Sequence, residues 1–186
     1  MGISTFPAGS SGLSTAQTKW VLLSRDDGQT ATATRTISNI SQNYNTLKLV
    51  ASGFTCASNY GFGFRFNGQS TGYSENFRYF TNVNYPQGGY NINTDVGGGN
   101  FGDNYRANQR QFHELTIYNY TSSDAKYYEY SASFNQSSNN ASAGFTGTGI
   151  FSISSNSAIT SVSIISNSDS TSSNNAAAGF FVFGAL

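Results

Sequence analysis

The chain has 186 residues, of which 10% are charged and 15% aromatic, and its nine basic and nine acidic residues cancel. The charges stand singly along the sequence, so no basic stripe follows a phosphate backbone, and we expect no nucleic-acid binding. No segment is apolar over the length of a membrane span and no signal peptide is visible, so we expect no membrane insertion. The 15 Phe and 12 Tyr exceed what disordered chains carry, which predicts a folded protein with a neutral polar surface over an aromatic core.

The first 17 residues differ in composition from the rest of the chain. They are rich in Gly, Ser and Thr, and their only apolar anchors are Ile3, Phe6, Pro7 and Leu13. This composition is typical of an extended arm that becomes ordered only against a partner. We therefore predict an N-terminal arm over residues 1–17, with these four residues as its partner-binding contacts.

Residues 18–186 have the pattern of one all-β domain. Short runs of β-branched and aromatic residues alternate with clusters of Asn, Gly, Ser and Asp, and no helix is predicted. The predicted strands cover residues 18–25, 31–37, 44–52, 60–67, 111–120, 126–134, 144–152, 158–165 and 177–184. About nine strands suffice for two facing sheets, so the predicted fold class is all-β, a single antiparallel β-sandwich behind an extended N-terminal arm.

Alternation along two predicted strands indicates which faces are buried. Phe62, Phe64 and Phe66 occupy every second position of 60–67, so they should point into the core. In 111–120 the predicted core face carries His113, Leu115 and Ile117. The opposite face carries Phe112, Tyr118 and Tyr120, which form a candidate interface if that face is not core.

Between residues 70 and 110 the strand pattern dissolves into Asn, Gly and Tyr. Only 76–79 and 91–93 have the character of short strands, so we predict a long loop, which in a compact domain usually has a function. Its aromatic residues are suited to stacking on sugar rings or to packing against a neighbouring subunit. The predicted receptor or interface residues of this loop are Tyr85, Tyr90, Phe101 and Tyr105.

Residue types that support catalysis are few. His113 is the only histidine and Cys56 the only cysteine, so neither a metal site nor a Cys–His nucleophile pair is indicated, and we expect no cofactor. Glu114 and Glu129 are the best carboxylate pair, because they can face each other on neighbouring strands. Both lie where an outward polar residue is expected, so the sequence predicts a non-enzymatic protein.

Three segments resemble a known family. The first runs from Lys19 to Ser24 and continues through Ile37–Ile40 and Tyr44–Gly53. The second is Phe64–Gly68, followed by Gly72 and Tyr73. The third is Ala158–Ile164 together with Ala178–Gly184. In these segments the chain is similar to jelly-roll-like structural proteins of tailed-bacteriophage virions, of the decoration and tail-fibre types, although it has Gln69 where members often carry Asp and Phe183 where they carry Tyr.

The resemblance implies a jelly-roll-like sandwich at the virion surface, assembled in the bacterial host cytoplasm as a homotrimer or another symmetric homo-oligomer. Its partners would be the major capsid protein or tail proteins. We favour a capsid cement or decoration protein, whose arm would order across neighbouring capsid subunits. The alternative is a tail-fibre or receptor-binding protein whose long loop contacts a host surface glycan.

Overall fold

The computed structural model describes residues 19–27, 32–56, 62–81, 87–93, 96, 109–135, 142–153, 156–166, 172–173 and 178–186. The regular elements in these ranges are all β-strands. In this part of the chain there is no helix long and apolar enough to cross a membrane. The predicted arm at 1–17 lies outside the described residues.

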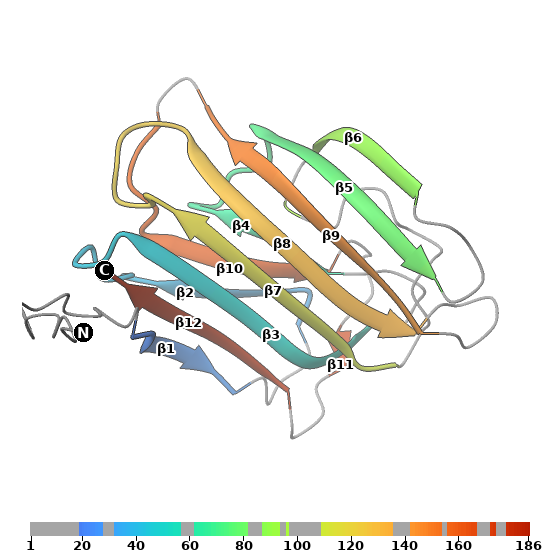
Figure 1. Cartoon of the computed structure of the whole chain (residues 1–186). Coiled ribbons are helices and arrows are strands. Elements are labelled where there is room, and N and C mark those ends of the chain that lie inside the picture. The colour runs from blue at the N-terminus through green and yellow to red at the C-terminus, as the bar shows by residue number, and fades with distance from the viewer. Residues whose placement is uncertain are drawn as a thin grey trace, which may run out of the picture.

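The strands form two antiparallel sheets. The large sheet has the order β1 (Val21–Asp26), β12 (Gly179–Ala185), β3 (Thr46–Cys56), β7 (Gln111–Tyr118), β8 (Lys126–Asn135), β9 (Ser142–Phe151), β5 (Tyr73–Thr81) and β6 (Gln87–Asn93), with β11 (Ser172–Ser173) also paired to β3. The small sheet has the order β2 (Thr34–Ser38), β10 (Ser161–Ser166) and β4 (Phe62–Phe66). Figure 1 shows the small sheet behind the large one, so the predicted antiparallel β-sandwich is confirmed.

The prediction of one long loop over residues 70–110 is wrong for part of that range. β5 runs for nine residues and is hydrogen-bonded on both sides, to β9 and to β6. Its alternation was hidden because polar residues occupy both faces: the buried Glu75 lies on the core side and the exposed Asn76 on the other. The predicted short strand at 76–79 is therefore part of a longer strand, whose hydrophobic alternation is interrupted at Glu75.

The core lies between the sheets and is rich in aromatic rings. Phe62, Phe64 and Phe66 are almost completely buried, as predicted. The Phe66 ring meets Tyr73 and Phe151 of the large sheet at centroid distances of 5.6 and 5.3 Å. Such edge-on ring pairs add about 0.5–1.5 kcal/mol each beyond the area they bury. The rings of β4 therefore help to hold the small sheet to the large one, together with buried aliphatic residues of β2 and β10.

Asn67 ties the turn after β4 to the segment before β10. Asn67 and Gly68 have positive φ angles of 49° and 68°, and Asn39 has a similar φ of 58°. Asn and Gly tolerate this backbone conformation best. The Asn67 Oδ1 accepts hydrogen bonds from the backbone N–H groups of Thr160 and Ser161, at 2.9 and 3.1 Å. Its Nδ2 donates to the carbonyl of Ala158 at 2.9 Å. Two of the segments that carry the family resemblance therefore meet here.

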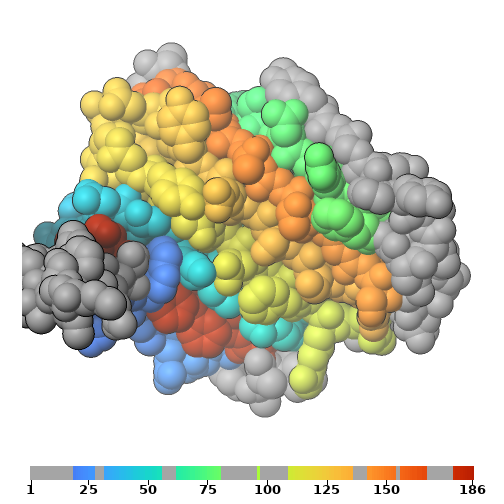
Figure 2. Space-filling view, in the orientation of Figure 1, coloured from blue at the N-terminus to red at the C-terminus, as the bar shows by residue number. Residues whose placement is uncertain are grey.

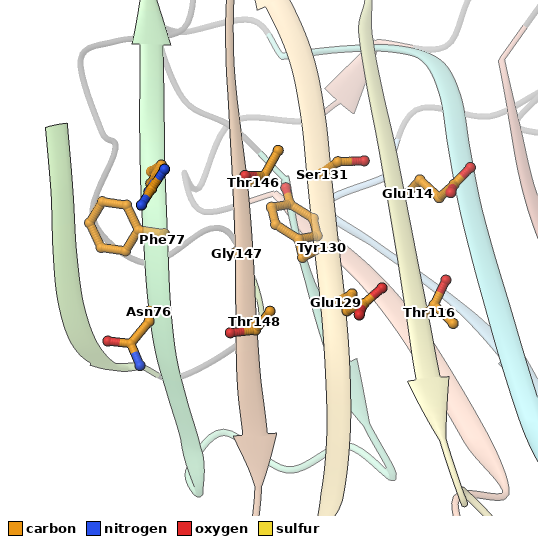
Figure 3. A pocket seen from close by; sticks show the side chains of 11 residues that line it. Asn76, Phe77, Glu114, Thr116, Glu129, Tyr130, Ser131, Thr146, Gly147 and Thr148 are labelled. Atoms are coloured by element: carbon orange, nitrogen blue, oxygen red, sulfur yellow. The ribbon is translucent and has the colours of Figure 1, made fainter. Parts of the chain in front are cut away.

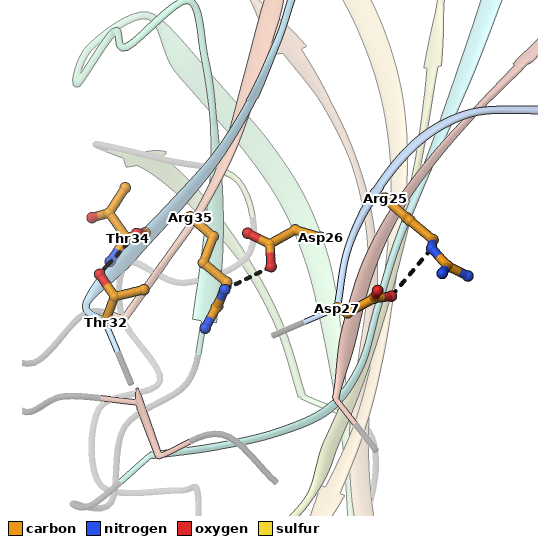
Figure 4. Close-up of polar contacts among 6 residues, drawn as sticks. All are labelled: Arg25, Asp26, Asp27, Thr32, Thr34 and Arg35. Atoms are coloured by element: carbon orange, nitrogen blue, oxygen red, sulfur yellow. Dashed lines mark hydrogen bonds and ion pairs between the residues drawn. The ribbon is translucent and has the colours of Figure 1, made fainter. Parts of the chain in front are cut away.

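An ion pair joins the edges of the two sheets. Arg35 of β2 is 7% exposed, and its Nη1 donates to Oδ1 of Asp26, in β1, at 2.7 Å (Figure 4). The guanidinium also lies 5.7 Å from the centroid of the Phe54 ring. A second pair, Arg25 with Asp27 at 3.2 Å, is more than half exposed on both sides. Burial of Arg35 makes the first pair costly to break, because removal of one partner deprives the other of this ion pair at the edge of the core.

These two pairs provide a matched test of that argument. Arg35→Ala should lower the free energy of unfolding by about 2–4 kcal/mol, somewhat below the range for fully buried pairs because Asp26 is partly solvated. Arg25→Ala should lower it by less than about 1 kcal/mol, because water screens an exposed pair. Urea denaturation of both variants measures the difference. Equal losses would contradict a structural role for the Arg35–Asp26 pair.

Candidate functional site

The face of the large sheet that points away from the small sheet carries a polar groove. In Figures 1 and 2 no described segment lies in front of it. The groove crosses β7, β8, β9 and β5 and has a volume of about 480 Å³. We call it the outer-face groove; its outward side chains are Glu114, Thr116, Glu129, Ser131, Thr146, Thr148, Asn76 and Arg78.

Strand register sets these side chains in two rows across the sheet. One row is Thr116, Glu129, Thr148 and Asn76, which are paired in turn from β7 to β5. The other is Glu114, Ser131, Thr146 and Arg78. Figure 3 shows Glu114, Ser131 and Thr146 at one level on neighbouring strands, and Thr116, Glu129 and Thr148 at the other. Because adjacent strands lie about 4.8 Å apart, each row presents polar groups over roughly 14 Å.

Both carboxylates of the groove have a polar side chain of a neighbouring residue beside them. Glu114 Oε1 lies 3.1 Å from Nζ of Lys48, which also sits 5.0 Å from the centroid of the Trp20 ring. Glu129 accepts a hydrogen bond from the hydroxyl of Tyr118, whose pKa is raised by burial and then by that bond and the carboxylate charge. Glycoside hydrolysis requires one of two carboxyl groups to be protonated. Binding of ligand hydroxyls requires only that the carboxyl oxygens accept hydrogen bonds, which Glu114 and Glu129 can both do.

Exposed apolar residues border the polar rows at both ends. On one side Tyr118, Tyr127 and Ile150 form a row in which Tyr127 is 59% exposed. The hollow beneath them continues into the groove through Asn76, Glu129 and Thr148. On the other side lie Phe112 and Phe80, 39% and 40% exposed. The outer face therefore has a polar centre and aromatic margins.

The only histidine is a core residue, as predicted. His113 is completely buried, with Nδ1 at 2.6 Å from the Tyr130 hydroxyl and Nε2 at 2.9 Å from Oε1 of Gln111. The tautomer that fits donates from Nε2 and accepts at Nδ1. Burial lowers the pKa of His113 to about 3. The imidazole is neutral and enclosed, so it does not act on a ligand in the outer-face groove.

Two other buried polar groups also serve the fold. Lys126 donates from Nζ to the carbonyls of Ser122, at 2.7 Å, and Asp124, closing the turn before β8, and its burial lowers its pKa. Glu75 accepts a hydrogen bond from the Tyr128 hydroxyl at 3.2 Å. No group of three His, Cys, Asp or Glu that could hold a metal is present in the described ranges.

Of the predicted interface aromatics, Phe112 and Tyr118 lie on the outer face, whereas the prediction for Tyr120 is wrong. Tyr120 is fully buried, and its hydroxyl donates to the carbonyl of Ser41. Asn119, directly after the strand, has a left-handed φ of 55°, and the next side chain, Tyr120, lies in the core. Alternation fails at this point because the strand stops at Tyr118.

Most of the predicted loop and arm contacts fall outside the described residues. These are Ile3, Phe6, Pro7, Leu13, Tyr85, Phe101 and Tyr105. Tyr90 lies in β6, where its backbone is paired with Asn76. The outer-face groove brings together Glu114 and Glu129, which the sequence analysis paired. It also places threonine and serine hydroxyl groups beside them, which the sequence analysis did not predict. Thr146 and Thr148 alternate in the sequence, but their neighbours depend on β9 lying between β8 and β5.

No family model, curated protein or solved structure matches this chain.

The neutral state of His113 can be measured directly, because its ring gives the only histidine signal of the natural chain. The C2 proton resonance should keep its neutral position from pH 8 to below pH 5. An unfolded histidine protonates near pH 6.5 and the folded one near 3, so unfolding takes up a proton between these values. Stability should therefore fall as the pH drops below about 6.5, by up to about 1.4 kcal/mol per pH unit from this group.

Comparison with His113→Gln separates this contribution from that of the carboxylates. The free energy of unfolding of the natural chain should decrease more steeply than that of the variant between pH 6.5 and 4.5. A titration midpoint near 6.5 for the ring proton would contradict the buried His113–Tyr130 contact.

Proposed function

We propose that the protein is a non-enzymatic structural protein of a tailed-phage virion, and that it works by binding through the outer face of its large sheet. The observation that carries this proposal is the groove with a polar centre and aromatic margins on a sheet face that no described segment covers. Glu114 and Glu129 place hydrogen-bond acceptors in this groove, which suits a binding role. The virion setting rests on the resemblance of the three sequence segments.

Of the two expected roles, the outer face favours contact with a host glycan. Protein interfaces generally have an apolar centre and a polar rim. The outer face has the reverse order, since Glu129, Thr148 and Thr146 lie in the middle and Tyr127 and Phe112 at the margins. A sugar matches this order because it needs many hydrogen bonds and a flat ring to stack on.

Capsid decoration stays the second candidate. Its support is the composition of residues 1–17, which suits an arm lying across neighbouring capsid subunits. On either role the protein would be a symmetric homo-oligomer, because virion positions are related by symmetry.

The copy number of the chain in purified virions tests the proposal. Quantitative mass spectrometry against the major capsid protein should give a small multiple of three or six if the chain belongs to a tail appendage. A number comparable with that of the capsid protein would instead indicate decoration. Absence of the chain from purified particles would overturn the virion proposal altogether.

A further inference from the structure

We infer that the outer-face groove binds an uncharged oligosaccharide, which stacks one sugar ring on Tyr127 and bonds its hydroxyls to Glu129 and Thr148. This inference rests on the proposal that the outer face is the binding surface, and it adds the chemical class of the ligand and the residues that select it.

The polar side chains of the groove match the hydrogen-bonding needs of sugar hydroxyls. A hydroxyl both donates and accepts. Carboxylates such as Glu129 only accept, guanidinium groups such as Arg78 only donate, and Thr148 and Asn76 do both. These groups line one groove on four adjacent strands. A ligand lying across the strands therefore meets acceptors and donors along its whole length.

Tyr127 supplies an apolar platform beside these groups. It is the most exposed aromatic side chain among the described residues, at 59%, and it lies between Tyr118 and Ile150 on the neighbouring strands. The hollow that these residues line shares Glu129 and Thr148 with the outer-face groove. A sugar stacked on Tyr127 would thus have its hydroxyls within reach of the polar row.

The charges of the groove favour an uncharged ligand. On β7 and β8 the groove carries two carboxyl groups, Glu114 and Glu129, beside the single ammonium of Lys48. An acidic sugar on the β7–β8 half would be repelled by both carboxylates. Arg78 is the only basic residue lining the groove, and it lies at the far side, on β5. An uncharged glycan avoids this repulsion and still uses every polar group.

The dimensions of the groove fit a short chain of sugars better than one ring. Its volume of about 480 Å³ falls within the range of small-molecule sites, roughly 300–1,000 Å³. The polar rows extend over roughly 14 Å, from the spacing of four strands. A single ring would fill only part of that length.

The test uses the full chain on an array of uncharged hexose and N-acetylhexosamine oligosaccharides, printed beside oligosaccharides that carry uronic or sialic acid. Titration calorimetry with the best uncharged probe then compares variants. Tyr127→Ala should weaken binding about tenfold or more, the size expected from the loss of a stacked ring. Glu129→Gln should weaken it by a similar factor, because an amide replaces a charged acceptor.

Two control variants match these changes in kind. Leu22→Ala removes an exposed apolar side chain of β1, at the opposite edge of the large sheet from β6, that lines neither Tyr127's hollow nor the outer-face groove. Asp27→Asn neutralises an exposed carboxylate near the same edge of the sheet. Both should bind the probe within about twofold of the natural chain. All four side chains are well exposed, so the thermal midpoints should stay close together, which excludes unfolding as the cause of lost binding.

Loss of binding to the uncharged probe in Tyr127→Ala and Glu129→Gln, but not in the control variants, would support the inference. Preferential binding of acidic glycans, equal losses in the control variants, or no binding to any glycan by a folded chain would overturn it. These outcomes can be distinguished from failure of the virion proposal. A chain that is present in particles but binds no glycan would refute only the glycan-binding role of the groove. A chain that binds glycan but is absent from particles would refute only the virion setting.

Discussion

The two-residue alternation along β7 and β8 is the constraint on which both the core and the outer face depend. Buried residues such as Leu115 and Tyr130 alternate with outward residues such as Glu114 and Ser131. Because the side-chain period of a strand is two, a shift of one residue would exchange the two faces completely. The register that buries the aromatic core is thus the register that places the polar rows on the outer surface.

The unequal widths of the sheets explain why the outer face is available. The small sheet covers one face of the large sheet, and its β4 packs Phe64 and Phe66 against rings from several strands. Antiparallel sheets commonly bury one face and leave the other in contact with water. A solvated face normally carries scattered polar residues. In this protein the strand register arranges the polar residues in rows, and the exposed Tyr127 and Phe112 lie at the margins of the outer face.

Much of the fold was predictable because hydrophobic alternation is a local signal. The burial of Phe62, Phe64 and Phe66 and the core position of His113 follow from it directly. β5 was predicted only over residues 76–79, because Glu75 on its core face interrupts the hydrophobic alternation. Tyr120 was misplaced because a single left-handed residue, Asn119, ended the alternation. Both errors arise where polar or backbone effects override the hydrophobic pattern.

The candidate site was less predictable than the fold. Glu114 and Glu129 were recognisable as an outward pair on consecutive strands. Thr148 and Asn76 join them only because β9 lies beside β8 and β5 lies beside β9, and sheet order between distant segments is set by the packing of the whole domain. The sequence therefore predicted the chemical character of two residues and not the surface to which they belong.

Accessibility of alternate β8 positions to a thiol reagent tests the central claim most directly. Single cysteines at Glu129, Tyr130, Ser131 and Ala132, in a chain with Cys56 replaced by Ser, would be labelled with a maleimide in the isolated protein and in assembled particles. Rapid labelling at 129 and 131 in both samples, with 130 and 132 protected, is the predicted result. Labelling without alternation, or loss of labelling at 129 and 131 on assembly, would contradict an outer face that is open to a ligand in the virion.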